Sequence, residues 1–211
     1  MKITKYGHAC LLIEENGARL LIDPGSYSSG FEDLDELDAI LITHHHADHY
    51  TVENMKGLLK NNPRAMVMAD ETTAGQLQET GIKAAVMRAG DQLEIAGISI
   101  KGYGTLHAII HHSIPQHLNV GYMIADRFFY PGDALTVPEA KVEILAIPSA
   151  APWSKVGETI DYLLDIKPKV AIPVHDAILS RPSLYGQMLG RFTEQIGTEI
   201  HVLEQAESTE A

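Results

Sequence analysis

The sequence predicts an α/β fold, a four-layer αββα sandwich in which two mixed β-sheets pack together and helices lie outside them. Three observations lead to it. The first part of the chain reads as consecutive strands, both halves then alternate strands with helices, and 211 residues suffice for one substantial core. We therefore expect a single domain over residues 1–203, followed by a polar, frayed tail over residues 204–211.

The first half is predicted to begin with a strand hairpin. Asn16-Gly17 lies between two apolar runs and is a strong signal for a tight turn. Asp23-Pro24-Gly25-Ser26 then breaks the strand pattern. The elements expected up to residue 104 are strands over 2–6, 9–14, 18–22, 39–42, 65–68, 85–87, 92–95 and 98–104, and helices over 51–59 and from Asp70 or Glu71 to Glu79.

The second half repeats this theme without an evident sequence repeat. Its strands are expected over residues 120–125, 127–130, 143–147, 170–174 and 199–202. A helix is predicted over 155–166, with Ser154 as its candidate N-cap and apolar residues along one face. A second helix is predicted over 182–196, with Pro182 in the first turn, where proline is tolerated.

Charge and composition limit the classes of partner. The formal net charge is −12, which disfavours a sequence-independent grip on nucleic acid, because such binding needs Lys and Arg against the phosphates. No apolar run approaches the ~18 residues of a membrane span, and the N-terminus lacks the apolar core of a signal peptide. We expect a cytoplasmic, soluble protein with a small-molecule substrate and neither a nucleic-acid nor a membrane partner; its oligomeric state is not predicted.

Cys10 is the only cysteine, so the chain cannot form an intramolecular disulfide. A reducing compartment is the simplest interpretation. Because Cys10 lies in the apolar run Ala9-Cys10-Leu11-Leu12-Ile13, we expect a small buried hydrophobe rather than a nucleophile or metal ligand.

The segment Thr43-His44-His45-His46-Ala47-Asp48-His49 holds four potential metal ligands directly after an apolar strand. They are His44, His46, Asp48 and His49. Neutral imidazole together with carboxylate suits zinc, iron or manganese. The alternative is a polar histidine-rich loop that binds metal adventitiously, or part of an expression tag; a tag would lie at a terminus and would lack the aspartate.

Three further candidate ligands each follow a predicted strand. They are His107, Asp133 and His175. Alone, each is weak evidence, since a histidine after a strand is more often a hydrogen-bonded structural residue and Pro-Gly-Asp is common in turns. Together with the first cluster they predict a metal site built on the ends of several strands, which hold ligands more rigidly than flexible loops do.

These motifs resemble the metallo-β-lactamase-fold hydrolases, whose HxHxDH motif, later His, later Gly-Asp and final His match nearly the whole chain. Leu21-Ile22-Asp23-Pro24 resembles the superfamily's early strand-to-Asp motif, which implies that Asp23 orients the ligand loop. The opening Gly7-His8-Ala9-Cys10-Leu11-Leu12-Ile13 looks most like the branch that contains L-ascorbate-6-phosphate lactonase. The resemblance implies one metal held by His44, His46 and His107, a second held by Asp48, His49 and His175, and Asp133 bridging both.

The third motif departs from the family pattern. It reads Thr105-Leu106-His107-Ala108-Ile109-Ile110-His111-His112, with His117 close behind. We expect His107 to be the ligand because it is nearest the strand end, with His111 as the alternative.

Four features around the predicted site stay open. His8 is expected either at the pocket, as a rim residue or behind a ligand, or as an ordinary hydrogen-bonded strand residue. Asp176 could orient the imidazole of His175 or cap the following turn. Trp153 could line a pocket or pack under the helix beginning near residue 155, and residues 110–119 could form a lid.

The predicted function is that of a metal-dependent hydrolase acting on a small ester, lactone or phosphodiester. Two divalent metals, zinc or else manganese or iron, would supply a metal-bound hydroxide, and Asp48 would act as general acid/base beyond its role as a ligand. One alternative is a mononuclear iron oxygenase of the persulfide dioxygenase type on the same fold. Another is a metal-binding module without catalysis.

Overall fold

The computed structural model describes residues 1–211 and contains two seven-stranded sheets. The first sheet has the order β14-β1-β2-β3-β4-β5-β6 and the second β13-β12-β11-β10-β9-β8-β7. The strands of the first sheet are β1 Lys2–Lys5, β2 Leu11–Glu15, β3 Ala18–Ile22, β4 Ala39–Ile42, β5 Met66–Ala69, β6 Ala85–Val86 and β14 Glu207–Glu210. Those of the second are β7 Gln92–Ile95, β8 Ile98–Tyr103, β9 Gly121–Ile124, β10 Phe128–Tyr130, β11 Ile144–Pro148, β12 Val170–Val174 and β13 Glu199–Ile200.

Both sheets are mixed. Antiparallel hairpins join β1, β2 and β3, whereas β3, β4, β5 and β6 pair in parallel. In the second sheet β7 to β10 pair antiparallel and β10 to β13 pair in parallel. Parallel neighbours need a crossover connection, and helices on the outer faces provide four of these six crossovers, whereas the connections from β3 to β4 and from β10 to β11 contain no helix.

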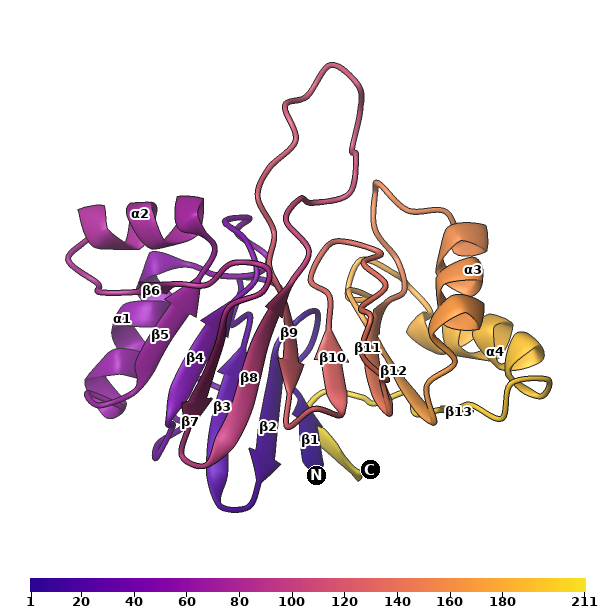
Figure 1. The fold of residues 1–211 in the computed structure, drawn as a ribbon, viewed down its shortest axis with the longest axis horizontal. Helices are drawn as coiled ribbons and strands as arrows, with labels where there is room; N and C mark the ends of the chain where they lie inside the picture. Colours follow the sequence, from indigo (N-terminus) through magenta and orange to yellow (C-terminus); the bar gives the residue numbers. More distant parts are fainter.

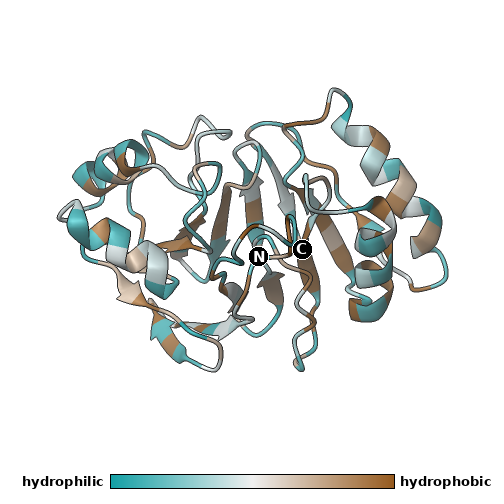
Figure 2. Ribbon diagram, turned by 90° about the horizontal axis from the view of Figure 1, so that it is seen from above, coloured by the Kyte–Doolittle hydropathy of each residue, from teal (hydrophilic) through white to brown (hydrophobic).

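Four helices cover the sheets in two pairs (Figure 1). They are α1 Val52–Asn61, α2 Glu71–Glu79, α3 Val156–Ile166 and α4 Pro182–Thr193. Met55 and Leu58 of α1 and Leu77 of α2 pack on the outer face of the first sheet, while Leu163 of α3 and Leu189 of α4 pack on that of the second. Each helix therefore carries both hydrophobic and hydrophilic residues, as Figure 2 shows.

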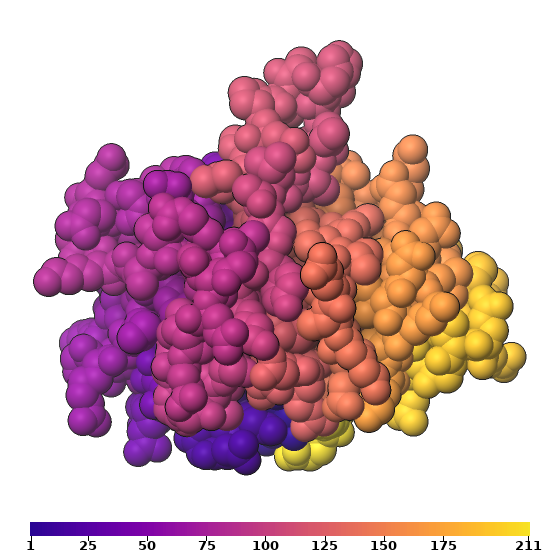
Figure 3. Space-filling model, in the orientation of Figure 1, coloured from indigo at the N-terminus to yellow at the C-terminus, as the bar shows by residue number.

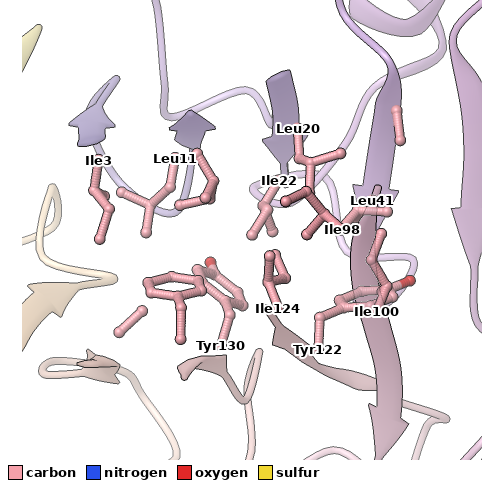
Figure 4. Close-up of a cluster of buried hydrophobic side chains, with 14 of the residues drawn as sticks. Ile3, Leu11, Leu20, Ile22, Leu41, Ile98, Ile100, Tyr122, Ile124 and Tyr130 are labelled. Atoms are coloured by element: carbon pink, nitrogen blue, oxygen red, sulfur yellow. The ribbon is translucent and has the colours of Figure 1, made fainter. Parts of the chain in front are cut away.

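The main core lies between the two sheets. Ile3, Leu11 and Ile22 of the first sheet face Tyr122 and Tyr130 of the second, and all five side chains are buried (Figure 4). Burial of such side chains contributes roughly 1.5–3 kcal/mol each. The predicted four-layer αββα sandwich is confirmed, with its helices outside.

Two local predictions were wrong. The C-terminal residues are not frayed, because Glu207–Glu210 form β14, which pairs antiparallel with β1. Ser154 is not the N-cap of α3; Lys155 takes that position, and its backbone N–H donates to Glu158 Oε2 at 2.9 Å.

Cys10 is fully buried in the core under the helices, as predicted. None of the helices combines the length and the apolar character that crossing a membrane requires.

The connection between β8 and β9 rises as a long loop above the rest of the molecule (Figures 1 and 3). This loop contains His107, and the ends of β4, β10 and β12 carry the other candidate ligands nearby.

Candidate metal centre

The structure brings all seven predicted ligand residues together, in groups that share members. Their order follows the strands: the first four come directly after β4, and one each follows β8, β10 and β12. The residues are His44, His46, Asp48, His49, His107, Asp133 and His175.

The first group joins three imidazoles to one carboxylate. Ligand atoms of His44, His46, His107 and Asp133 all lie within 4.8 Å of one another. His44 Nε2 lies 3.0 Å from His46 Nδ1, and His107 Nε2 lies 3.3 Å from Asp133 Oδ2. The four side chains therefore surround a single point.

The second group shares Asp133 with the first. Asp133 Oδ1 lies 3.1 Å from His49 Nε2, and Asp133 Oδ2 lies 3.1 Å from His175 Nε2. Asp48 lies beside this group, with its Oδ2 3.4 Å from His175 Nε2 and 3.9 Å from His49 Nε2, and its ligand-type atoms form a separate group with those of His8 and His175. One carboxylate thus faces both groups.

Backbone carbonyls fix the orientation of two of these imidazoles. His107 Nδ1 donates to Ala108 O at 2.6 Å, and His175 Nδ1 donates to Ala150 O at 2.7 Å. A carbonyl oxygen can only accept, so each Nδ1 carries a proton. The neutral ring then has its lone pair on Nε2, the atom that faces Asp133.

Asp23 orients the ligand loop after β4, as the family resemblance implies. Its Oδ1 accepts from the backbone N–H of Thr43 at 2.8 Å, and its Oδ2 accepts from Thr43 Oγ1 at 2.8 Å and from His49 Nδ1 at 2.7 Å. Thr43 Oγ1 also lies 3.0 Å from His44 Nδ1. A hydrogen bond to the outer ring nitrogen is a common feature of metal-binding histidines.

Several atoms at the meeting point are buried without a hydrogen-bond partner. These are the Nε2 atoms of His49, His107 and His175 and the Oδ1 atom of Asp133. A buried polar atom left unsatisfied costs about 1–3 kcal/mol, so several facing one another need a common partner. A divalent cation suits this set, because imidazole nitrogen and carboxylate oxygen are ligands of zinc, iron and manganese.

Burial and neighbouring charges set the protonation of the site. Burial lowers the pKa of His44 well below its usual value and that of His46 to about 4, so both rings are neutral near pH 7. Burial by itself would raise the pKa of Asp133, but the neighbouring His49, His107 and His175 outweigh it and hold that pKa well below its usual value. Burial by itself would lower the pKa of His49 and His175, but Asp133 and the neighbouring carboxylates outweigh it and raise the first well above its usual value and the second to about 9. A cation would therefore displace a proton from these two rings, because neutral imidazoles and an ionised carboxylate are the forms that bind metal.

The backbone is specialised where the ligands meet. His175 adopts φ +63°, a left-handed conformation that costs a non-glycine residue roughly 1–3 kcal/mol and that often occurs at functional sites. Gly25 lies against the ligand loop so closely that a Cβ there would stand 1.8 Å from Asp48 O. The Asp23-Pro24-Gly25 break thus ends a strand and also makes room for the Asp48 turn.

Two residues that support Asp133 were not assigned this role from the sequence. Trp153 Nε1 donates to Asp133 Oδ2 at 2.8 Å. Asn119 Oδ1 accepts from the backbone N–H of Asp133 at 3.0 Å, and Asn119 Nδ2 donates to Pro131 O at 2.8 Å. Trp153 was expected only as a pocket wall or packing residue, and no sequence signal marked Asn119.

In the third motif the geometry favours His107 over His111. His107 is buried among the other ligands, whereas His111 is exposed and its Nδ1 lies 2.7 Å from Ser113 Oγ. The ring of His117 packs against His45 and His46 instead, with ring centroids 4.5 and 5.3 Å apart.

Neither expectation for the Asp176 side chain is correct. Its carboxylate contacts neither the imidazole of His175 nor the following turn, where the Leu179 N–H donates to the backbone carbonyl of Asp176 at 3.0 Å. Both carboxylate oxygens accept from Lys5 Nζ at 2.7 Å. The group that orients His175 is the Ala150 carbonyl.

A cavity of about 450 Å³ adjoins the centre at His107. Its apolar lining comes from Leu106, Ala108, Ile109, Leu135 and Trp153. The remaining lining residues are His107, Gln116, Thr136 and Glu158, so the lining includes no Lys or Arg. The Trp153 indole therefore faces both the cavity and the carboxylate shared by the two ligand groups.

Comparison with known proteins shows the family of the chain and agrees with its fold. The family model described as "Beta-lactamase superfamily domain" matches residues 2–175, so the chain belongs to the β-lactamase superfamily, in its metallo-β-lactamase fold. Within this superfamily the chain is similar to proteins named UPF0173. It is 31% identical to the UPF0173 protein of Pyrococcus abyssi, with 83% of each chain covered.

Another relative and two solved structures extend the comparison. The chain is 44% identical to Protein Rv0786c of Mycobacterium tuberculosis, with 96% of each chain covered. Igni18, a metallo hydrolase of Ignicoccus hospitalis, has a TM-score of 0.78 at 17% identity, covering 99% of this chain and 97% of that one. An isothiocyanate hydrolase from Delia radicum gut bacteria has a TM-score of 0.73 at 18% identity, covering 100% and 99%. At these identities the structures share the fold, and the likeness to the ascorbate-phosphate lactonase branch stays a prediction.

Proposed function

We propose that this protein is a hydrolase that binds two divalent cations, zinc or else manganese or iron, and acts on a small molecule. The observation that carries the proposal is the set of buried, unpartnered ligand atoms that face one another, with Asp133 common to both groups. His44, His46 and His107 would hold one cation, Asp48, His49 and His175 the other, and Asp133 both. Relatives named UPF0173 metal-dependent hydrolase in Staphylococcus carnosus and Methanocaldococcus jannaschii support this class of activity.

Bound divalent cations would lower the pKa of water and polarise the bond to be cleaved, so the protein needs no side-chain nucleophile. The chain's own contribution is to fix the ligands and to move protons. Asp48 is proposed as the general acid/base, because its side chain is 22% exposed whereas that of Asp133 is 4% exposed. Asp48 is therefore the carboxylate of the centre that solvent, and a substrate arriving from it, can reach.

The cavity lining guides the choice of substrate. Trp153, Leu106, Ile109 and Leu135 offer an apolar surface beside His107, and no Lys or Arg of the lining would pair with an anion. Among the small ester, lactone and phosphodiester substrates, an uncharged ester or lactone with an apolar group is the best match. A phosphodiester substrate carries a negative charge, and in this cavity only the bound metals could neutralise that charge.

The test uses the untagged protein as purified. Its metals are first counted by elemental analysis, and an aryl acetate, an aryl butyrate, a γ-lactone and bis(p-nitrophenyl) phosphate are then assayed with zinc, manganese or iron restored. We expect two metals per chain and hydrolysis, fastest on the esters or lactone, that a chelator abolishes. A single iron with dioxygen consumption and no hydrolysis would support the oxygenase instead, and bound metal without any turnover would support a binding module.

A further inference from the structure

His8 is a fully buried histidine that lies against the metal centre without being one of its seven predicted ligands. Its side chain is 0% exposed, and its ring centroid lies 4.0 Å from that of His175. The backbone carbonyl of His8 accepts from the N–H of His175 at 2.7 Å. The segment between β1 and β2 is thus attached to the segment that follows β12.

The hydrogen bonds of the His8 ring determine its tautomer. The backbone N–H of Ala177 donates to His8 Nδ1 at 3.1 Å. A backbone N–H can only donate, so Nδ1 carries a lone pair and the ring proton is on Nε2. This tautomer is the reverse of that in His107 and His175, whose Nδ1 atoms donate to carbonyls.

The tautomer decides which role the ring can take. His8, Asp48 and His175 have ligand-type atoms within 4.8 Å of one another, which by position alone would allow a third imidazole ligand. A protonated Nε2 has no lone pair, however, and so it donates a hydrogen bond rather than binding a cation. His8 Nε2 is buried without a hydrogen-bond partner, and the Asp48 Oδ2 acceptor lies 3.4 Å from it, which is long for a hydrogen bond.

We propose that His8 is a positioning residue for Asp48: its Nε2–H donates to the Asp48 carboxylate and fixes the oxygen that this side chain presents to the metal centre. The inference rests on the proposed metal-binding role of Asp48. Without this donor, the partly exposed carboxylate is free to rotate away from His175 and His49.

The size of the effect expected on losing this donor follows from its place behind a metal ligand. Groups behind metal ligands commonly contribute a factor of about 10–100 in metal affinity or activity.

The first experiment determines the tautomer directly. Long-range ¹H–¹⁵N correlation spectra of the metal-free protein, labelled with ¹⁵N-histidine, should show His8 with the proton on Nε2, and His8→Gln assigns the signal. A proton on Nδ1 would overturn the proposal. Because no cation is present, the result does not depend on whether the protein is a hydrolase.

The second experiment separates a positioning residue from a ligand. Zinc is titrated into metal-free wild type, His8→Phe and His8→Gln in competition with a chromogenic chelator. His8→Phe should weaken one of the two sites by about 10–100-fold while two zinc ions still bind at saturation, and His8→Gln, whose amide can donate, should recover much of the loss. His112→Gln, an exposed histidine without a hydrogen bond in the structure, is the matched control and should bind like wild type.

The outcomes are distinct. Loss of one zinc at saturation in both His8 variants would make His8 a ligand and overturn the proposal, as would unchanged affinity in His8→Phe. Circular dichroism shows whether His8→Phe folds. If it does not, the tautomer of His8 and the zinc affinity of His8→Gln test the proposal instead. If the wild-type protein binds two zinc ions but hydrolyses none of the substrates, the proposed function is refuted, whereas the positioning role of His8 still stands.

Discussion

Lys5 and Asp176 form a buried ion pair between the two sheets. Lys5 Nζ lies 2.7 Å from both carboxylate oxygens and also donates to Pro173 O at 3.0 Å. The two side chains are 4% and 5% exposed. The pair joins β1 of the first sheet to the residue that directly follows His175, so it fixes one side of the metal centre.

Replacing Lys5 with Met should destabilise the fold by roughly 3–5 kcal/mol, because it leaves the buried Asp176 carboxylate without its partner. The double variant Lys5→Met/Asp176→Leu should lose less than Lys5→Met alone, since no unpaired charge remains. Urea unfolding followed by circular dichroism measures both free energies. Lys2→Met, which removes an exposed pair with Glu14, is the control and should cost less than about 1 kcal/mol. A double variant no more stable than Lys5→Met would mean that the unpaired Asp176 carboxylate is not the source of the loss.

The layers and the grouping of the candidate ligands could be predicted because both depend on local patterns. Apolar runs bounded by turn signals marked the strands, and a ligand at the end of a buried strand is placed by the sheet itself. His107, Asp133 and His175 are distant in sequence, yet the ends of β8, β10 and β12 bring them to one edge.

The features that the sequence did not reveal depend on tertiary partners. Residues 207–210, Glu-Ser-Thr-Glu, have no apolar face, and they form β14 only because β1 offers an unpaired edge. Asp176 was matched with its neighbour His175, whereas its partner Lys5 lies 171 residues away. The hydrogen bond from Trp153 to Asp133 likewise has no local signature.

Replacing Asp48 with Asn should lower turnover by about 10²–10⁴-fold while the fold stays intact, because the amide cannot exchange a proton with substrate. Rates should be compared per bound metal, since Asp48 is also a proposed ligand. Asp126→Asn, which changes an exposed carboxylate paired with Lys101, provides the control. Full activity per metal in the Asp48 variant would refute the general acid/base role.

Replacing His107 with Ala should remove metal from the centre, because His107 is buried against Asp133 at 3.3 Å. Replacing His111 with Ala should leave the metal content unchanged, since His111 is exposed and contacts Ser113. Elemental analysis of both variants after dialysis gives the answer. The reverse pattern would move the third-motif ligand to His111.

Cys10 should resist thiol reagents in the folded protein. Burial raises the pKa of its thiol well above the ordinary value, so at pH 8 the folded chain holds less thiolate than the unfolded chain, and the reagent has no access. Ellman's reagent should therefore detect no thiol in the native protein at pH 8 and one thiol per chain in urea. Rapid labelling of the native protein would show that the region under α1 and α2 opens readily.

Trp153 should report metal binding through its fluorescence. It is the only tryptophan, and its indole N–H donates to Asp133, the carboxylate common to both ligand groups. Binding of a cation changes the charge beside the indole, so zinc added to metal-free protein should shift the emission intensity in proportion to occupancy. Emission that stays constant while elemental analysis records zinc uptake would argue against this contact.

Replacing Trp153 with Phe separates its two contacts. Phenylalanine keeps an apolar ring against the cavity but removes the N–H, so zinc affinity should fall by about 10–100-fold, while KM for an aryl butyrate measured at saturating zinc should change little. Trp153→Ala should lower zinc affinity similarly and also raise KM, because the ring surface beside Leu106 and Leu135 is lost. A rise in KM with no change in zinc affinity in both variants would assign Trp153 to the substrate alone. The distinction matters because a residue that contacts both the shared carboxylate and the cavity couples metal binding to substrate binding.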